Sequence, residues 1–366
     1  MFSIKNKYNK ILLISVVILT IFGIIMIYSA SHIWALYKFN NALKYAIFQL
    51  LFAGLGFILM KIISKIDYKI YYEKANLIIL LCLILLILVL IPGLGVVRNG
   101  SRSWFSIFSF SIQPSEIAKL GLIIFVSKYL SKVKKINFKE ILPVLIVVGL
   151  FFGLIMLQPD FGTGMVLVMS IVALLFISGL NMKFFYILGF VGIIGITALI
   201  VIAPYRMARI TSFIDPWKDP LGTGFQIIQS LYAIGPGGLL GQGFLNSRQK
   251  HFYLPEPQTD FIFSIISEEF GIAGVLIVSS LFIFILYCGM KIALNSKDSF
   301  GKYLAFGMTF QMLIQTLMNL MVVIGLIPVT GVTLPFLSYG GSSLLISMVS
   351  IGIILNISKQ NPIHEK

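Results

Sequence analysis

One carboxylate, Asp260, stands where a polar stretch with two prolines turns into a long apolar run, in the segment YLPEPQTDFIFSIISEEFG at residues 253–271. A carboxylate at the start of a helix can accept hydrogen bonds from the free N–H groups of the first turn and act as its N-cap. It can also act as a general base, because partial burial raises the pKa of a carboxyl group toward neutrality. The spacing leaves both interpretations of Asp260 open.

Three glutamates accompany Asp260 in the same segment. Glu256 lies between the two prolines and is predicted to be a solvated loop acid or a partner of Asp260. Glu268 and Glu269 fall inside the apolar run, where a charge is costly unless it faces other helices or a wet cavity. We therefore expect them to form either a buried polar lock between helices or part of a polar cavity.

Three further stretches combine polar side chains with the start of an apolar run. In VRNGSRSWFSIFSFSIQPSEIAKL, residues 97–120, Glu116 and Lys119 are three residues apart and are expected to pair within a helix. In QPDFGTG, residues 158–164, Asp160 follows a proline and is expected to cap the next helix. PVTGVTLPFLSYGGSS, residues 328–343, contains Ser338 and resembles a broken helix, which is tolerated at membrane depth where it lines a cavity.

The composition requires these stretches to be positioned by membrane helices. The chain has 366 residues, 58% hydrophobic and 11% charged, with a mean hydropathy of +0.99. A helix of about 20 apolar residues crosses a bilayer, and backbone groups in lipid must be paired within the helix. We therefore predict an all-α polytopic membrane protein, a single membrane domain over residues 1–366, with about ten spans: 11–30, 43–62, 76–92, 113–130, 141–157, 163–179, 184–203, 261–287, 303–325 and 338–357.

The net charge of +15 is read as a topology signal rather than as a nucleic-acid footprint, so no nucleic-acid partner is expected. Most lysines fall in inner segments when both chain ends are placed in the cytoplasm. The largest extracytoplasmic loop then runs over about 203–259. Its GFQIIQSLYAIGPGGLLGQGF stretch predicts a short amphipathic helix, followed by glycines that belong either to a flexible turn or to a backbone that a ligand approaches closely.

The arginines follow a different pattern from the lysines, because every one falls in an outer segment in this topology. The planar guanidinium group binds phosphate through two parallel hydrogen bonds. The pattern arises either by chance in a lysine-rich chain or from an external anionic ligand, and it favours the ligand. The arginines are Arg98, Arg102, Arg206, Arg209 and Arg248.

Two classes of chemistry lack their motifs. No HExxH, CxxC or clustered histidines are present, which argues against zinc chemistry, and no Walker A motif is present, which argues against nucleotide hydrolysis. No resident cofactor is assigned with certainty. A divalent cation, Mg²⁺ or Mn²⁺, could share the work of the arginines, although the sequence shows no cage of ligands for it.

The polar stretches together resemble one family of bacterial membrane proteins. NGSRSWF…IQPSEIAK, QPDFGTG, APYRMARITSFIDPWKDPLGTGFQIIQSLYAIGPGGLLGQG, RQKHFYLPEPQTDFIFSIISEEFG and GVTLPFLSYGGSS resemble motifs of the SEDS family (shape, elongation, division and sporulation), in the same order. The resemblance covers nearly the whole chain. The long outer loop is more similar to the FtsW and SpoVE branch than to RodA.

The resemblance implies an activity, partners and residue roles. SEDS proteins are peptidoglycan glycosyltransferases of the bacterial cytoplasmic membrane. They polymerise lipid II at its outer face and work with a class B penicillin-binding protein and with other division or sporulation proteins. The essential aspartate of the family corresponds to Asp260, its tryptophan after the SR pair to Trp104, and the aspartate of its QPD motif to Asp160. Division-type members often have arginine where this chain has Ser111.

The implied substrate makes one base chemically sufficient. A lipid diphosphate is already a good anionic leaving group, so cations can stabilise it, whereas glycoside hydrolysis usually needs two carboxylates. A lipid II flippase and a non-catalytic scaffold for the transpeptidase are the alternatives. We predict Asp260 as the base; Arg98, Arg102, Trp104, Lys119, Asp160, Arg206, Arg209, Arg248 and Glu256 as substrate-binding residues; and Glu116, Glu268, Glu269 and Ser338 as supporting residues.

Overall fold

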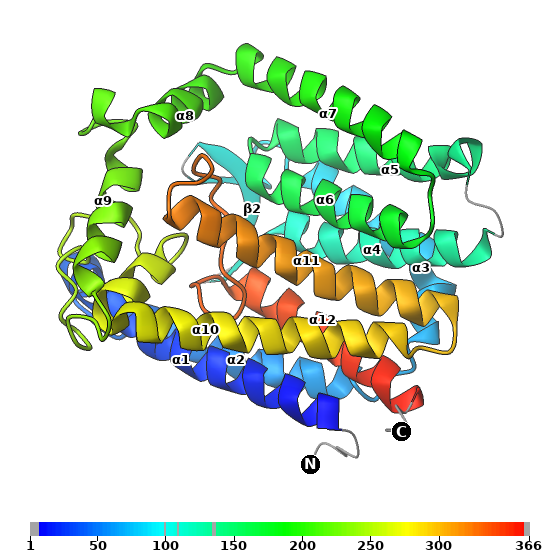
Figure 1. The fold of residues 1–366 in the computed structure, drawn as a ribbon, viewed down its shortest axis with the longest axis horizontal. Coiled ribbons are helices and arrows are strands. Elements are labelled where there is room, and N and C mark those ends of the chain that lie inside the picture. The colour runs from blue at the N-terminus through cyan, green and yellow to red at the C-terminus, as the bar shows by residue number, and fades with distance from the viewer. Residues whose placement is uncertain (1–6, 99, 108–109, 134–136, 362–366) are drawn as a thin grey trace.

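Helices dominate the computed structural model, which describes residues 7–98, 100–107, 110–133 and 137–361 (Figure 1). Each of the ten predicted apolar runs forms a helix, so the mostly helical fold is confirmed. These helices are α1 (Lys7–Phe39), α2 (Lys44–Ile63), α3 (Lys69–Leu88), α4 (Pro114–Lys132), α5 (Phe138–Leu157), α6 (Phe161–Ile177), α7 (Met182–Ile202), α10 (Ile262–Leu294), α11 (Ser299–Val323) and α12 (Gly341–Gln360).

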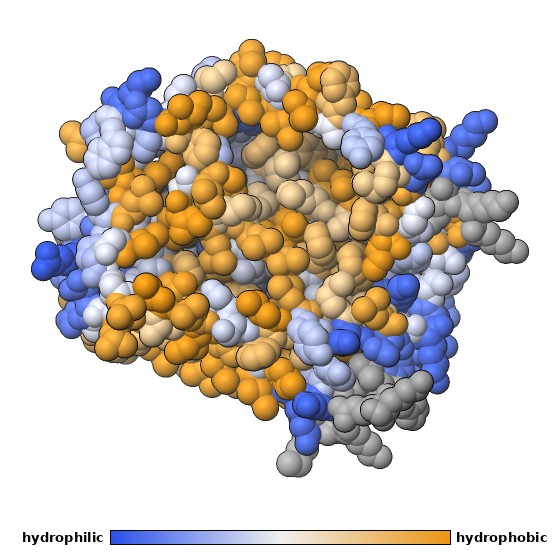
Figure 2. All heavy atoms as spheres, in the orientation of Figure 1, coloured by the Kyte–Doolittle hydropathy of each residue, from blue (hydrophilic) through white to orange (hydrophobic). Residues whose placement is uncertain are grey.

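Eight of these helices are long and apolar enough to cross a membrane, within the described part of the chain. The two that fall outside this group are α6, which is apolar but shorter, and α4, which carries Glu116 and Lys119. Figure 2 shows an apolar middle between two ends where hydrophilic residues gather, as a membrane protein requires. The number of spans and the cytoplasmic placement of both chain ends stay predictions.

A small sheet is the part of the fold that the all-α prediction missed. Strands β1 (Val96–Arg98), β2 (Ser101–Ile107) and β3 (Phe110–Ile112) pair antiparallel in the order β1-β2-β3. The strands lie between α3 and α4, in the stretch with Arg98, Arg102 and Trp104. Short strands of mixed polarity give a weak periodic signal in a chain that is otherwise apolar, which explains why they were missed.

The helices divide the molecule into a tightly packed bundle and one outlying helix. α1 packs on α10, α2 on α12, α3 on α4, and α11 contacts α4, α6 and α10. Helix α7, at the edge of Figure 1, has no buried side chain along its length. It leads into the short helices α8 (Pro204–Ile214), η1 (Pro216–Lys218), α9 (Phe225–Ile234) and η2 (Gly235–Gly237).

The short helices gather at the end of the bundle opposite the two chain ends (Figure 1). We call this the loop end. The predicted amphipathic helix is confirmed as α9, which packs on α10. The hydroxyl group of Ser230 in α9 lies 2.7 Å from both the Ser264 hydroxyl group and the Val323 carbonyl oxygen. These contacts hold the long loop against α10 and α11.

The glycines after α9 serve a purpose that neither predicted interpretation covered. Helix α10 is interrupted at Gly271, where φ is +60°, and the loop backbone pairs with the groups that the interruption frees. Gln242 donates to the Glu268 carbonyl (2.9 Å), and Ile272 donates to the Gly238 carbonyl (3.0 Å). A Cβ atom on Gly241 would lie 2.2 Å from the Glu269 carbonyl oxygen. Gly237 and Gly241 therefore let the loop backbone approach α10 at a distance that a side chain would prevent.

A buried ion pair completes this attachment. Nζ of Lys250 lies 2.9 Å from Oε1 of Glu269, and both side chains are almost fully buried. The Ser29 hydroxyl group of α1 donates to the same carboxylate at 2.6 Å. Glu268 accepts from the Ser247 hydroxyl group (2.5 Å) and from the Arg248 N–H (2.8 Å). Of the two predicted alternatives, the structure therefore shows a polar lock joining α1, α10 and the long loop.

Replacing Lys250 with Met should destabilise the protein, because it leaves the Glu269 carboxylate buried without its cation. Breaking a buried ion pair from one side costs about 3–5 kcal/mol. The double variant Lys250→Met/Glu269→Gln removes both charges and should recover much of this loss. Thermal unfolding of the purified protein in detergent measures the effect.

A matched control for this experiment is Lys218→Met. Lys218 belongs to the same long loop, but its side chain is exposed and lies 3.8 Å from the Asp215 carboxylate, a contact that contributes little. This control should unfold like the wild type. Equal melting temperatures for Lys250→Met and the wild type would contradict a stabilising role of the buried pair.

Candidate active site

Asp260 lies at the loop end, immediately before α10, and it is not the N-cap of that helix. The N-cap position is Phe261, and the side chain of Phe261 makes no capping hydrogen bond. The capping interpretation of Asp260 is therefore wrong. Among the described residues, no hydrogen bond to the Asp260 carboxylate is present, although the residue is partly buried. A partly buried carboxylate without its own partner is available to take a proton from a ligand.

The surroundings of Asp260 raise its pKa to about 6. The largest cause is burial, which disfavours the charged form. The Glu256 carboxylate adds to the effect by repulsion, the Arg209 guanidinium group opposes it, and the Asp160 carboxylate contributes a smaller repulsion. Three residues predicted from separate stretches thus act electrostatically on Asp260.

Arg209 is the arginine that the fold brings to Asp260. It is exposed on α8, and its Nη1 donates to the Val329 carbonyl oxygen at 2.9 Å. Val329 belongs to the loop between α11 and α12. In this loop, Gly331 has a φ of +74°, and a Cβ atom there would lie 3.6 Å from Oδ2 of Asp260. Arg209, the loop and Asp260 therefore form one contiguous polar region.

The other arginines are distributed more widely over the loop end. Arg206 donates to the Leu199 carbonyl (2.9 Å), and Arg102 donates to the Leu90 carbonyl (3.3 Å). Arg98 is exposed on β1, with its guanidinium carbon 5.7 Å from the Trp104 ring centroid. Arg248 is exposed on the segment that Glu268 holds. These arginines do not converge on Asp260 in this arrangement.

Asp160 interacts electrostatically with Asp260 and also with the Glu116–Lys119 pair. As predicted, Asp160 caps α6, accepting from the Thr163 N–H at 3.1 Å. Its other carboxylate oxygen accepts from Nε2 of Gln113 at 2.9 Å. Burial raises the pKa of Asp160, while these hydrogen bonds to Thr163 and the charge of Lys119 oppose the rise.

Glu116 and Lys119 form the predicted pair, with Nζ of Lys119 2.7 Å from Oε1 of Glu116. Lys119 is almost fully buried and also donates to Oε1 of Gln315 on α11 at 2.9 Å. Nε2 of Gln315 then reaches the Thr333 carbonyl (3.0 Å) and the Ser343 hydroxyl group (3.2 Å). This network joins α4, α11 and α12, so Lys119 lies within a set of protein partners.

Ser338 supports the loop between α11 and α12. Its hydroxyl oxygen accepts from the Leu334 N–H at 2.8 Å, and its carbonyl accepts from Nε2 of Gln49 at 3.1 Å. Glu256, by contrast, is exposed and has a φ of +45°, a strained value for a residue with a side chain. Its carboxylate raises the pKa of Asp260 by repulsion, which matches the predicted partner role better than that of an isolated loop acid.

Several polar residues of this region were missed from the sequence. Gln311, Gln315 and Asn319 lie four residues apart in α11 and are all buried. Their spacing puts them on one face of the helix, and amides within an apolar span are themselves a signal of function. A search of the spans for such amides would have found this face.

No metal site of three or more His, Cys, Asp or Glu side chains occurs in the part of the chain that the structure describes. Asp260, Glu256 and Asp160 interact electrostatically but do not form such a set. No step of a mechanism is therefore assigned to a metal held by the protein alone.

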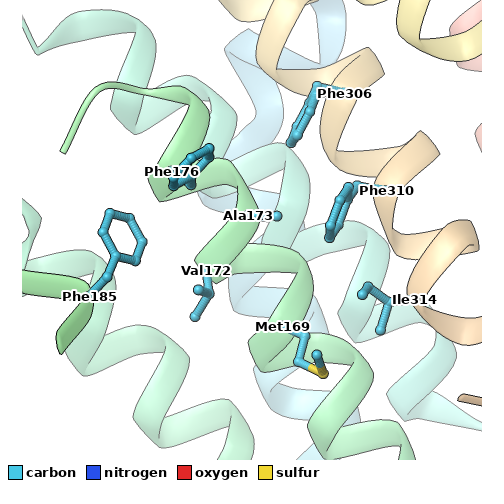
Figure 3. A pocket seen from close by; sticks show the side chains of 8 residues that line it. All are labelled: Met169, Val172, Ala173, Phe176, Phe185, Phe306, Phe310 and Ile314. Atoms are coloured by element: carbon cyan, nitrogen blue, oxygen red, sulfur yellow. The ribbon is translucent and has the colours of Figure 1, made fainter. Parts of the chain in front are cut away.

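An apolar groove of about 420 Å³ opens beside α6, where α7 stands away from the bundle. Phe306, Phe310 and Ile314 line it from α11, opposite α6, and Phe185 lies on α7 (Figure 3). The α6 side is formed by Met169, Val172, Ala173 and Phe176. The groove offers a surface for an apolar chain rather than for a polar ligand.

A family model described as cell cycle protein, covering FtsW, RodA and SpoVE, matches residues 9–363. The chain belongs to the SEDS family. This SEDS protein is 50% identical to stage V sporulation protein E of Bacillus subtilis (strain 168) over 358 residues, which cover 97% of this chain and 98% of that protein. It is 40% identical to the probable peptidoglycan glycosyltransferase FtsW of Geobacter sp. (strain M18) over 355 residues, 96% of each chain. These relatives place it in the FtsW/SpoVE branch.

Solved structures agree with this assignment. A chain from a study of how a peptidoglycan synthase complex coordinates polymerization and crosslinking has a TM-score of 0.78 and 29% identity to the SEDS protein, and the match covers 96% of this chain and 97% of that one. The crystal structure of Thermus thermophilus rod shape determining protein RodA has a TM-score of 0.71 and 26% identity, with the same coverage. The predicted family is confirmed over the whole fold.

Replacing Glu256 with Gln should lower the pKa of Asp260, because it removes a neighbouring negative charge. Replacing Arg209 with Gln should raise it, because it removes a positive one. Infrared difference spectroscopy of the carboxyl band, with Asp260→Asn to assign it, should show the wild-type group titrating near pH 6. Shifts in the same direction for both variants would contradict this account of the site.

Proposed function

We propose that this SEDS protein is a peptidoglycan glycosyltransferase that polymerises lipid II into glycan strands, for cell division or sporulation. The observation that carries the proposal is the Asp260 carboxylate, which is partly buried at the loop end, has a pKa of about 6 and is influenced by the positive charge of Arg209. The names of the relatives support the same activity. The loop end then faces outward from the bacterial cytoplasmic membrane.

Asp260 acts as the general base in this proposal. It takes the proton from a sugar hydroxyl group of the acceptor while the oxygen attacks the anomeric carbon of the donor. A new glycosidic C–O bond forms, the C–O bond to the lipid diphosphate breaks, and the bonding electrons leave with the diphosphate. A carboxylate with a pKa near 6 is mostly ionised at neutral pH and remains a stronger base than an unperturbed aspartate.

The leaving diphosphate needs positive charge rather than an acid. Arg209 is the cation that lowers the pKa of Asp260, and Arg206 lies on the same short helix. A divalent cation, Mg²⁺ or Mn²⁺, could arrive with the diphosphate and share this role. The apolar groove between α6, α7 and α11 lies in the span region, where the lipid chain of the substrate would need an apolar surface.

The polar residues argue for polymerisation over lipid transport. Glu116, Lys119 and Gln315 are buried and paired with one another, and Glu269 is paired with Lys250. A transport path would need polar groups available along the thickness of the bundle. We infer that the partner is a class B penicillin-binding protein transpeptidase, joined by other divisome or sporulation proteins. The study of a complex that coordinates polymerization and crosslinking supports such a pairing.

Asp260→Asn should abolish glycan polymerisation, with a loss of about 10²–10⁴-fold in rate, because the amide cannot accept the proton. The assay uses labelled lipid II with the purified protein and its transpeptidase partner, with Mg²⁺ or with EDTA. Asp219→Asn changes an exposed carboxylate of the same long loop and should leave the rate unchanged. Full activity of Asp260→Asn would sink the base assignment, and lipid transfer across liposomes without polymer would favour the flippase.

The polymerisation rate should fall as the pH drops below about 6, because Asp260 becomes protonated and loses its capacity as a base. Glu256→Gln should move this acid limb to lower pH. Arg209→Gln should move it to higher pH and lower the plateau by about 10²–10³-fold, as expected when a group that stabilises developing charge is removed. Rates measured between pH 4.5 and 8, at saturating lipid II, test both directions. If neither substitution changes the pH at which the rate falls, the titrating group is not Asp260.

A further inference from the structure

The direction of the Asp260 side chain depends on its backbone. Its carboxylate has no hydrogen bond to any residue that the structure describes, so the side chain is not tied in place by itself. Its carbonyl oxygen also lies outside the hydrogen-bonding pattern of α10, because the Ser264 N–H donates to Phe261 instead, at 3.0 Å. The partner of the Asp260 carbonyl therefore contributes to where the carboxylate points.

Asn319 on α11 holds that carbonyl. Its Nδ2 donates to the Asp260 carbonyl oxygen at 2.7 Å and to the Val332 carbonyl oxygen at 2.8 Å. Asn319 is 1% exposed. Both acceptors are carbonyl oxygens, which cannot donate, so the chemistry requires the NH₂ group on this side of the amide.

The second hydrogen bond of Asn319 holds the loop between α11 and α12, which faces the Asp260 carboxylate. Val332 follows Gly331, whose Cβ position would lie 3.6 Å from Oδ2 of Asp260. The same NH₂ group therefore sets the start of α10 and the neighbouring loop at one distance from each other. Oδ1 of Asn319 is buried without a hydrogen-bond partner among the described residues, so the two donor bonds are what orient the amide.

We infer that Asn319 is a positioning residue for Asp260, which aims the carboxylate by joining the Asp260 and Val332 carbonyls through one NH₂ group. The inference rests on the proposed function and adds a residue to it. Asn319 does not touch the reacting atoms. Its effect is on the distance and angle at which Asp260 meets the acceptor hydroxyl, and a misplacement of about 1 Å can cost a factor of about 10² in rate.

The test is Asn319→Leu, which keeps the approximate volume and removes both donors. The kcat for polymerisation of lipid II should fall about 10–100-fold, whereas the KM for lipid II should stay within about twofold, because the substrate-binding residues are untouched. The rate is expressed per folded protein, measured by gel filtration. A role confined to folding would lower the yield of folded protein and leave kcat unchanged.

Thr316→Val is the matched control on the same helix. Thr316 is also buried, but its hydroxyl group donates within α11, to the Met312 carbonyl at 2.8 Å. This variant also loses a buried polar group from α11 and should retain the wild-type kcat. A loss equal to that of Asn319→Leu would show that any polar deletion in α11 has the effect, and it would overturn the inference.

Asn319→Asp is the second variant and decides the question if the leucine variant does not fold. It keeps the shape of Asn319, but a buried carboxyl group offers at most one O–H donor in place of the two N–H donors, so at least one of the two bonds is lost and kcat is expected to fall. Wild-type kcat for the folded Asn319 variants, together with an inactive Asp260→Asn, would overturn the inference and leave the proposed function standing. Full activity of Asp260→Asn would overturn the proposed function instead.

Discussion

The carboxylate of Asp260 can keep an available lone pair only if other groups hold its backbone. A hydrogen bond from a neighbouring side chain would fix the carboxylate directly, but it would also stabilise the ionised form and weaken the base. In this SEDS protein, hydrogen bonds to backbone carbonyl groups, rather than to the carboxylate itself, position Asp260. The Asp260 carbonyl is held by Asn319, and the loop that faces the carboxylate is held by Asn319, Gln315 and Gln49.

The need to hold the backbone around Asp260 also explains why many buried polar side chains lie at the loop end. The long loop must stay in register with α10, because a buried backbone N–H or carbonyl group without a partner is costly. The interruption at Gly271 exposes carbonyl and N–H groups that the glycine segment after α9 then pairs. Lys250 and Glu269 fix this junction from the side. Each of these polar groups would be costly to bury without a partner, and in the packed structure they pair with one another.

Opposed charges then adjust the pKa of Asp260, the proposed base, which burial raises. The Glu256 carboxylate repels the ionised form of Asp260 and raises its pKa, whereas Arg209 attracts that form and lowers the pKa. Both effects act in addition to that of burial. Arg209 also contacts the Val329 carbonyl of the facing loop. Arg209 thereby lowers the pKa of Asp260 and also holds the loop between α11 and α12 that faces the Asp260 carboxylate. The position of α8 therefore affects both.

The sequence by itself determined the class of protein, the ten helices and the family, because apolar runs and ordered motifs are local properties of the chain. It also located Asp260 and predicted the Glu116–Lys119 pair and the Asp160 cap, which depend on neighbours only three residues away. Tertiary structure decided the rest. It excluded Asp260 as a cap, placed Gly237 and Gly241 against the interruption of α10, and separated Arg209 from the other arginines. It also joined Asn319 to Asp260, because that hydrogen bond spans 59 positions of the chain and exists only once α10, α11 and the following loop have packed together.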